Sequence, residues 1–168
     1  MNISRRALGG ISTAAILTAA GLGACSTSTT TISQGATDAA LIASGIAAAL
    51  AAVQTIPGVS STLIAQLQGY VATAQADATA IASATASTGA NLAQSIEAAV
   101  KVAAPLLLSL IPGSSALVNT VTPLINAAIS LISSLLSEYG VTSAIPSIVV
   151  PKYTPTEARL ILQGVVAK

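Results

Sequence analysis

Few side chains in this 168-residue chain could carry out chemistry. It contains no histidine, the commonest general base and the commonest metal ligand. Without histidine, neither a Ser-His-Asp nor a Cys-His catalytic arrangement can be assembled. The single cysteine, Cys25, has no disulfide partner within the chain. The carboxylates therefore remain as candidates for general acid and base catalysis.

The carboxylates are well separated in the sequence: Asp38, Asp77, Glu97, Glu138 and Glu157. Two of them, such as Asp77 and Glu97, could meet in the fold as the paired carboxylates of glycosidases do. Aromatic residues make up only 2% of the chain, however, so little is available to hold a sugar ring. We therefore expect no enzymatic activity, no catalytic residue, no metal ion and no cofactor.

The N-terminal segment has the three parts of an export signal. Arg5 and Arg6 form a basic start, residues 7–24 carry no charge, and small residues precede Cys25. The segment is rich in glycine and only mildly apolar, which favours a cleaved signal over a membrane span. We predict that residues 1–24 are a signal peptide removed before Cys25.

The sequence Leu22-Gly23-Ala24-Cys25 resembles the lipobox of bacterial lipoproteins. This resemblance implies a diacylglycerol on the Cys25 thiol, acylation of the new N-terminus, and a lipid bilayer as partner in the cell envelope, facing the periplasm. Ser26 follows Cys25, and by resemblance to enteric lipoproteins it permits sorting to an outer membrane, while an inner-membrane location stays open. The alternative is an ordinary secretory signal with an incidental cysteine.

The segment Ser4-Arg5-Arg6 resembles a twin-arginine export signal, and the weakly apolar stretch after it fits that type. The match is partial, because Leu8 and Gly9 stand where that family usually has Phe and Leu. The general secretory route is the alternative.

The composition favours close packing of helices and excludes some partners. The chain is 53% hydrophobic and 7% charged, and small residues dominate. Arg5 and Arg6 leave with the signal, so four of the six basic residues remain beside five acidic ones. Without a basic patch or an aromatic platform, nucleic-acid binding is not expected.

Four segments have the apolar spacing of amphipathic helices: 37–54, 61–86, 91–110 and 115–138. We predict an all-α fold in which residues 36–139 form an antiparallel four-helix bundle. The turn sequence Ile56-Pro57-Gly58 recurs as Ile111-Pro112-Gly113, so the bundle could consist of two similar αα-hairpins. Alternatively, Pro-Gly is simply a good turn former.

The charged residues of these helices have ordinary interpretations. Asp38 and Glu138 lie near helix ends, and Asp77 is expected to face solvent. Glu97 and Lys101 are four residues apart in the favourable order for an exposed ion pair.

The segments that flank the bundle differ from it in composition. Residues 25–35 hold Cys25 and a Ser/Thr-rich stretch, which we interpret as a flexible tether. Residues 140–168 are expected to form an extended segment and a short C-terminal helix. Thr154, Pro155 and Glu157 are typical of a helix start with a capping box.

The segment 115–138 carries a stripe of uncharged polar residues at helical spacing: Asn119, Thr122, Asn126, Ser130, Ser133 and Ser137. We expect this polar stripe to face water, with neighbouring helices covering the wide apolar arc. Pro123 could kink the helix, or Thr122 and Pro123 could begin it.

Three functions fit these observations. The first is a structural lipoprotein or one that binds a protein of the cell envelope. The second is a membrane-active helical protein, since residues 39–76 and 102–137 carry no charge and are long enough to span a bilayer. The third is a carrier of an apolar ligand in the bundle interior. The sequence does not indicate the oligomeric state.

Overall fold

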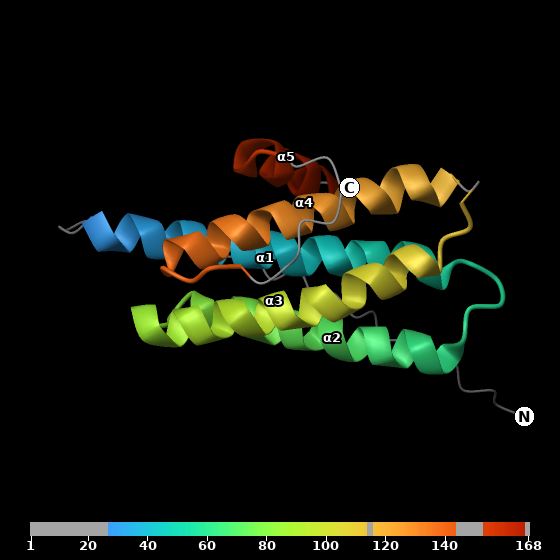
Figure 1. The fold of residues 1–168 in the computed structure, drawn as a ribbon, viewed down its shortest axis with the longest axis horizontal. Coiled ribbons are helices and arrows are strands. Elements are labelled where there is room, and N and C mark those ends of the chain that lie inside the picture. The colour runs from blue at the N-terminus through green and yellow to red at the C-terminus, as the bar shows by residue number, and fades with distance from the viewer. Residues whose placement is uncertain (1–26, 114–115, 144–152, 167–168) are drawn as a thin grey trace, which may run out of the picture.

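The computed structural model of the chain is all-α (Figure 1). It describes residues 27–113, 116–143 and 153–166, with side chains from residue 34 to residue 164 within these ranges. The helices are α1 (Thr27–Gln54), α2 (Ser61–Ile81), α3 (Ala86–Ser109), α4 (Ala116–Glu138) and α5 (Pro155–Val166).

Helices α1 to α4 lie side by side and form the predicted antiparallel four-helix bundle (Figure 1). α1 packs on α2 and α4, α2 packs on α3, and α3 also contacts α1 and α4. The contacts between α1 and α4 and between α2 and α3 are the most extensive. The last helix of the bundle, α4, therefore packs beside the first, α1. α5 lies on the outside of the bundle and packs on α4 and α1.

The turn between α1 and α2 was placed correctly by the Pro-Gly signal. α1 ends at Gln54 and α2 begins at Ser61, as predicted. Gly58 between them has a φ of 85°, a left-handed conformation that glycine adopts without steric cost.

The turn between α2 and α3 differs from the expectation. α2 ends at Ile81 instead of residue 86, and α3 begins at Ala86 instead of residue 91. Thr85 is the N-cap of α3, and its hydroxyl accepts a hydrogen bond from the Thr88 amide at 3.4 Å. The Ser/Thr-rich residues between the two predicted helices therefore belong to the start of α3, because Ser and Thr satisfy free amides at that end.

The helix α1 begins at Thr27, about three turns earlier than expected. Residues 27–33 had been assigned to a flexible tether, and that interpretation is wrong for this part of it. No proline or glycine interrupts residues 26–34, and extending an existing helix costs far less than starting one. A short polar run attached to a packed helix can therefore continue it.

The helix α4 runs through Pro123 without ending, so Thr122 and Pro123 are not its start. Its C-terminus has the hydrogen bonds of a Schellman motif. The Val141 amide bonds to the Leu136 carbonyl at 2.9 Å, and the Gly140 amide bonds to Ser137 at 3.1 Å. Gly140 has the positive φ, 69°, that this motif requires.

The core consists of branched aliphatic side chains packed among alanines, and α4 supplies the largest share of the large ones. The largest fully buried side chains are Ile42, Ile46, Leu67, Ile81, Ile96, Leu107, Ile125, Leu131, Ile132, Leu135, Leu136 and Leu162. Buried alanines occur on every helix, which allows the close packing that the composition predicted.

Candidate functional site

The residues predicted to direct export and lipidation lie outside the described residues: Arg5, Arg6, Leu22, Gly23, Ala24 and Cys25. The structure adds a second candidate site, which the sequence did not predict. It is the polar cluster where α1, α4 and α5 meet.

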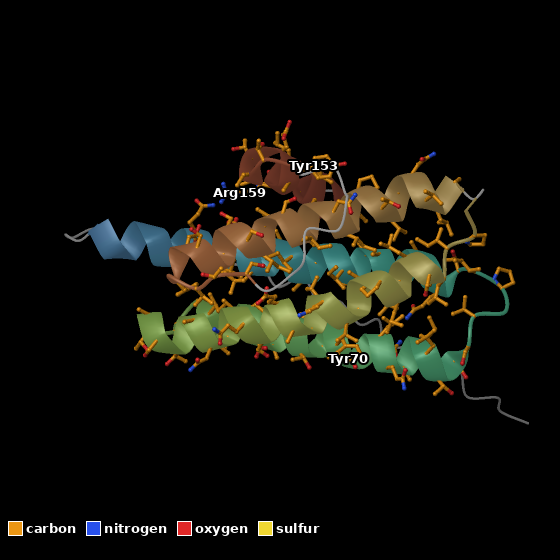
Figure 2. All side chains as sticks on the ribbon, viewed as in Figure 1. Tyr70, Tyr153 and Arg159 are labelled. Atoms are coloured by element: carbon orange, nitrogen blue, oxygen red, sulfur yellow. The ribbon has the colours of Figure 1, made fainter. Side chains whose placement is uncertain are left out.

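The centre of this cluster is an ion pair between Asp38 on α1 and Arg159 on α5. Arg159 donates from Nε to Oδ1 at 2.7 Å and from Nη2 to Oδ2 at 2.6 Å. The Asp38 side chain is 0% exposed and that of Arg159 is 25% exposed. Two parallel hydrogen bonds between charged groups form the strongest type of side-chain pairing. Figure 2 shows Arg159 projecting from α5 toward the bundle.

Glu138, the last residue of α4, lies near the same pair. Burial and the negative charge of Asp38 raise the pKa of the Glu138 carboxyl, against the opposing effect of Arg159. Its Oε2 atom is buried without a hydrogen-bond partner. The cluster therefore holds two carboxyl groups beside one guanidinium, and this arrangement disfavours ionisation of Glu138.

Tyr139 follows directly and fills the space between α1 and α3. A Cβ atom at Gly89 would lie 2.8 Å from Cζ of the ring, and one at Gly35 would lie 3.2 Å from the hydroxyl. The ring leaves no room for a Cβ atom at Gly89, whereas the atom nearest to a Cβ at Gly35 would be Glu138 Oε2, at 2.9 Å. Burial, followed by the charge of Glu138, raises the pKa of the Tyr139 phenol.

Two features position helix α5: capping hydrogen bonds at its N-terminus and one buried apolar contact further along. The Thr154 hydroxyl donates to Glu157 Oε2 at 2.7 Å, and the Thr154 amide donates to the same oxygen at 2.9 Å. This confirms the predicted capping box, and these hydrogen bonds lower the pKa of Glu157. Further along, Leu162 is fully buried against Gly45 of α1, where any Cβ would overlap its Cδ2 atom.

The carboxylates of α2 and α3 are more buried than expected. Glu97 is 7% exposed, and its Oε1 accepts a hydrogen bond from the Ser143 hydroxyl at 2.8 Å. The predicted exposed pair with Lys101 is therefore wrong, because only Lys101 lies at the surface. Asp77 is half-buried rather than solvent-facing, and its Oδ2 atom has no hydrogen-bond partner.

The polar stripe of α4 faces water only in part. Asn119, Ser133 and Ser137 are exposed, whereas Thr122 and Ser130 are half-buried. Asn126, at the middle, is 4% exposed, and its Oδ1 atom has no hydrogen-bond partner. The apolar arc is covered as expected, since α1, α3 and α5 all pack on α4.

The arrangement connects helices that are far apart in the sequence. Within the part of the chain that the structure describes, no group of three or more Asp, Glu, Cys or His side chains could hold a metal ion. The cluster joins α1 and α5 through one ion pair, and the Glu138 carboxyl of α4 lies near that pair. A sequence signal was present, because an Asp and an Arg on apolar helices are conspicuous in so weakly charged a chain. Their separation of 121 residues hid the pairing.

Among the described residues, three helical segments are long and apolar enough to cross a membrane: Gln34–Gln54, Ala86–Ser109 and Ala116–Glu138. Between 44% and 56% of their most apolar windows is buried within the protein. Much of their hydrophobicity therefore belongs to the core of the bundle.

Comparison with known proteins gives no relative: neither a protein-family model, nor a curated protein, nor a solved structure matches this chain.

Proposed function

We propose that this chain is an exported bacterial lipoprotein, anchored in the cell envelope through acylated Cys25, whose helical bundle has a structural or protein-binding role. The observation that carries the proposal is the sequence Leu22-Gly23-Ala24-Cys25 directly after a basic and apolar leader. A chain without histidine and with so few charged residues supports binding rather than catalysis.

The start of α1 adds a structural consequence to this proposal. Only Ser26 separates Cys25 from Thr27, the first residue of the helix. An anchor at Cys25 would therefore connect to the bundle through a continuous helix, and the anchored bundle would have little freedom to swing away from the bilayer.

The membrane-active alternative rests on the three apolar segments described above. The fold offers these segments another role, since each packs against other helices of the bundle. We therefore rank the anchored bundle first.

Labelling with radioactive palmitate tests the proposal. Cys25→Ala should abolish incorporation of the label and leave the precursor uncleaved, because the thiol accepts the lipid before cleavage. Ser26→Ala, which keeps the four lipobox residues, should label normally. Normal processing and release of the Cys25→Ala protein would overturn the proposal.

A further inference from the structure

The fold brings the two uncharged stretches of the sequence, 39–76 and 102–137, together at one end of the bundle. Each stretch contains the connection between two antiparallel helices, α1–α2 or α3–α4, and both connections lie at the same end (Figure 1). We call this end the uncharged tip: residues 54–64, 108–113 and 116–118. Counted from Ser109, the first charged residue on α3 is Lys101, about 12 Å away at 1.5 Å per residue. The charge-free length is greater on the other three helices.

The uncharged tip also holds large aliphatic side chains that the fold does not cover completely. These side chains are half-buried: Ile56, Val59, Leu63, Ile64, Leu108, Leu110, Ile111, Leu117 and Val118. Pro57 and Pro112, in the two connections, are exposed. At the opposite end of the bundle (Figure 1), the turn from Ala82 to Thr85 consists of small residues, and α4 ends in the charged Glu138. The two ends therefore differ in polarity.

Two side chains mark the depth at which the uncharged region ends. Tyr70 on α2 (Figure 2) is half-buried and lies about 14 Å along the helix from Ser61. Lys101, on the neighbouring α3, is exposed at a similar depth. Tyrosine is enriched at the boundary between lipid and water, and lysine can extend its charge from an apolar surface into water. Apolar faces that lie in a membrane interface are immersed by about 5–10 Å, which is less than the charge-free depth.

We propose that the uncharged tip is a membrane-contacting surface that inserts into the interface of a lipid bilayer while the bundle stays folded. Lipid is the occupant that fits, because hydrocarbon excludes charge. The tip residues also include no aromatic side chain and no arginine, the types that most often anchor a protein partner. This contact goes beyond the lipoprotein role proposed above. Because α1 begins at the opposite end (Figure 1), acylation of Cys25 and insertion of the tip can fail separately.

Vesicles of neutral phosphatidylcholine test the tip in the full chain carrying Cys25→Ala, which cannot be acylated and has no other thiol. A polarity-sensitive dye is attached at Ser60→Cys in the tip or, as the matched control, at Ser83→Cys in the opposite turn. Both serines are exposed, and the Ser60 side chain makes no capping hydrogen bond. Vesicles should brighten the dye at position 60 severalfold and shift its emission to the blue, but leave the dye at position 83 unchanged. High salt should not reduce the response, because no charge takes part.

Charges added to the chain labelled at position 60 give a second measurement. Pro112→Asp should raise the lipid concentration needed for half of the response about tenfold, because a carboxylate is disfavoured in the membrane. Pro57→Asp, in the other connection, should act alike and guards against misfolding of one variant. Ser83→Asp should have no effect.

Three results would overturn the proposal. The first is a dye at position 60 that does not respond, or that responds no more than the dye at position 83. The second is an unchanged lipid requirement in both Pro57→Asp and Pro112→Asp. The third is a dimer in sedimentation without lipid that Pro112→Asp dissociates, which would assign the tip to a second copy of this chain.

Discussion

Helices α4 and α5 pack against each other, but different forces keep them in the fold. α4 buries a broad set of large aliphatic side chains between α1 and α3, and no charged pair is needed to hold it. α5 buries Ala158 and Leu162 and adds the ion pair of Arg159 with Asp38. Apolar burial is tolerant of small shifts, whereas a buried ion pair depends on both partners. α4 therefore belongs to the stable core, and α5 is the element most easily removed.

The largest effect is expected from a charge in the core of α4. Ile132 is 0% exposed, so Ile132→Asp removes about 2–3 kcal/mol of apolar burial and adds the several kcal/mol needed to bury a carboxylate. This approaches the whole stability of a typical domain, about 5–15 kcal/mol. Circular dichroism should show loss of the cooperative thermal transition. Ser133→Asp, at the exposed neighbouring position, should keep it, and equal damage from both would contradict the assigned orientation of α4.

The next largest effect should come from Arg159→Ala. Removing one partner of a buried pair typically costs about 3–5 kcal/mol. The partial exposure of Arg159 places the expected value near the lower end. Release of α5 lets Asp38 reach water, so the damage should stay local. Hydrogen exchange should show that the α5 amides lose protection while those of α1 to α4 keep it.

The matched control for this prediction is the charge exchange Asp38→Arg with Arg159→Asp, which restores an opposite pair in reversed order. It should recover part of the α5 protection. Global loss of protection in Arg159→Ala would show that α5 is an integral part of the core, and the contrast with α4 would fail.

A smaller effect is expected where α4 meets α3. Gly89→Ala places a Cβ against the Tyr139 ring, which follows α4, and such overpacking typically costs about 1–3 kcal/mol. Gly69→Ala on α2 is the control, because nothing lies within 4 Å of its Cβ position. Replacing an open helical glycine by alanine should stabilise the fold by up to about 1 kcal/mol. Urea unfolding should therefore move the two midpoints in opposite directions.

The smallest expected effect is a change in how thermal stability depends on pH. The raised pKa of Glu138 means that folding disfavours its ionised form. Its contribution to stability is therefore greatest in acid and declines as the pH rises from the ordinary value of a glutamate through the raised one. Glu138→Gln should melt above the wild type at neutral pH, and the difference should vanish in acid.

For comparison, the contribution of Glu157 to stability should change with pH in the opposite direction, and Glu157→Gln tests this. The pKa of Glu157 is lowered by its hydrogen bonds to Thr154, so its contribution is present at neutral pH and is lost as the pH falls through the lowered pKa. Melting temperatures measured across the acid range test both signs. A Glu138→Gln protein that melts below the wild type at neutral pH would contradict the unfavourable placement of this carboxylate.

Local signals in the sequence predicted most of the helical framework. The apolar spacing of 115–138, the turn at Pro57 and Gly58, and the capping box at Thr154 each act over a few residues, and each was placed correctly. Where two local signals competed, the prediction failed. Ser87, Thr88 and Gly89 lie between the predicted helices 61–86 and 91–110, but Thr85 caps a helix that includes them.

The sequence by itself determined the all-α class, the bundle and the helix starts that use local caps, because these depend on periodicity and on hydrogen bonds between near neighbours. Tertiary structure decided which polar groups are buried. Asp38 and Arg159 meet across 121 residues, Glu97 bonds to Ser143, and Gly89 is required by a tyrosine from the end of α4. No local pattern specifies such contacts, since they arise only when the packing of the helices brings distant side chains together in a low-dielectric interior.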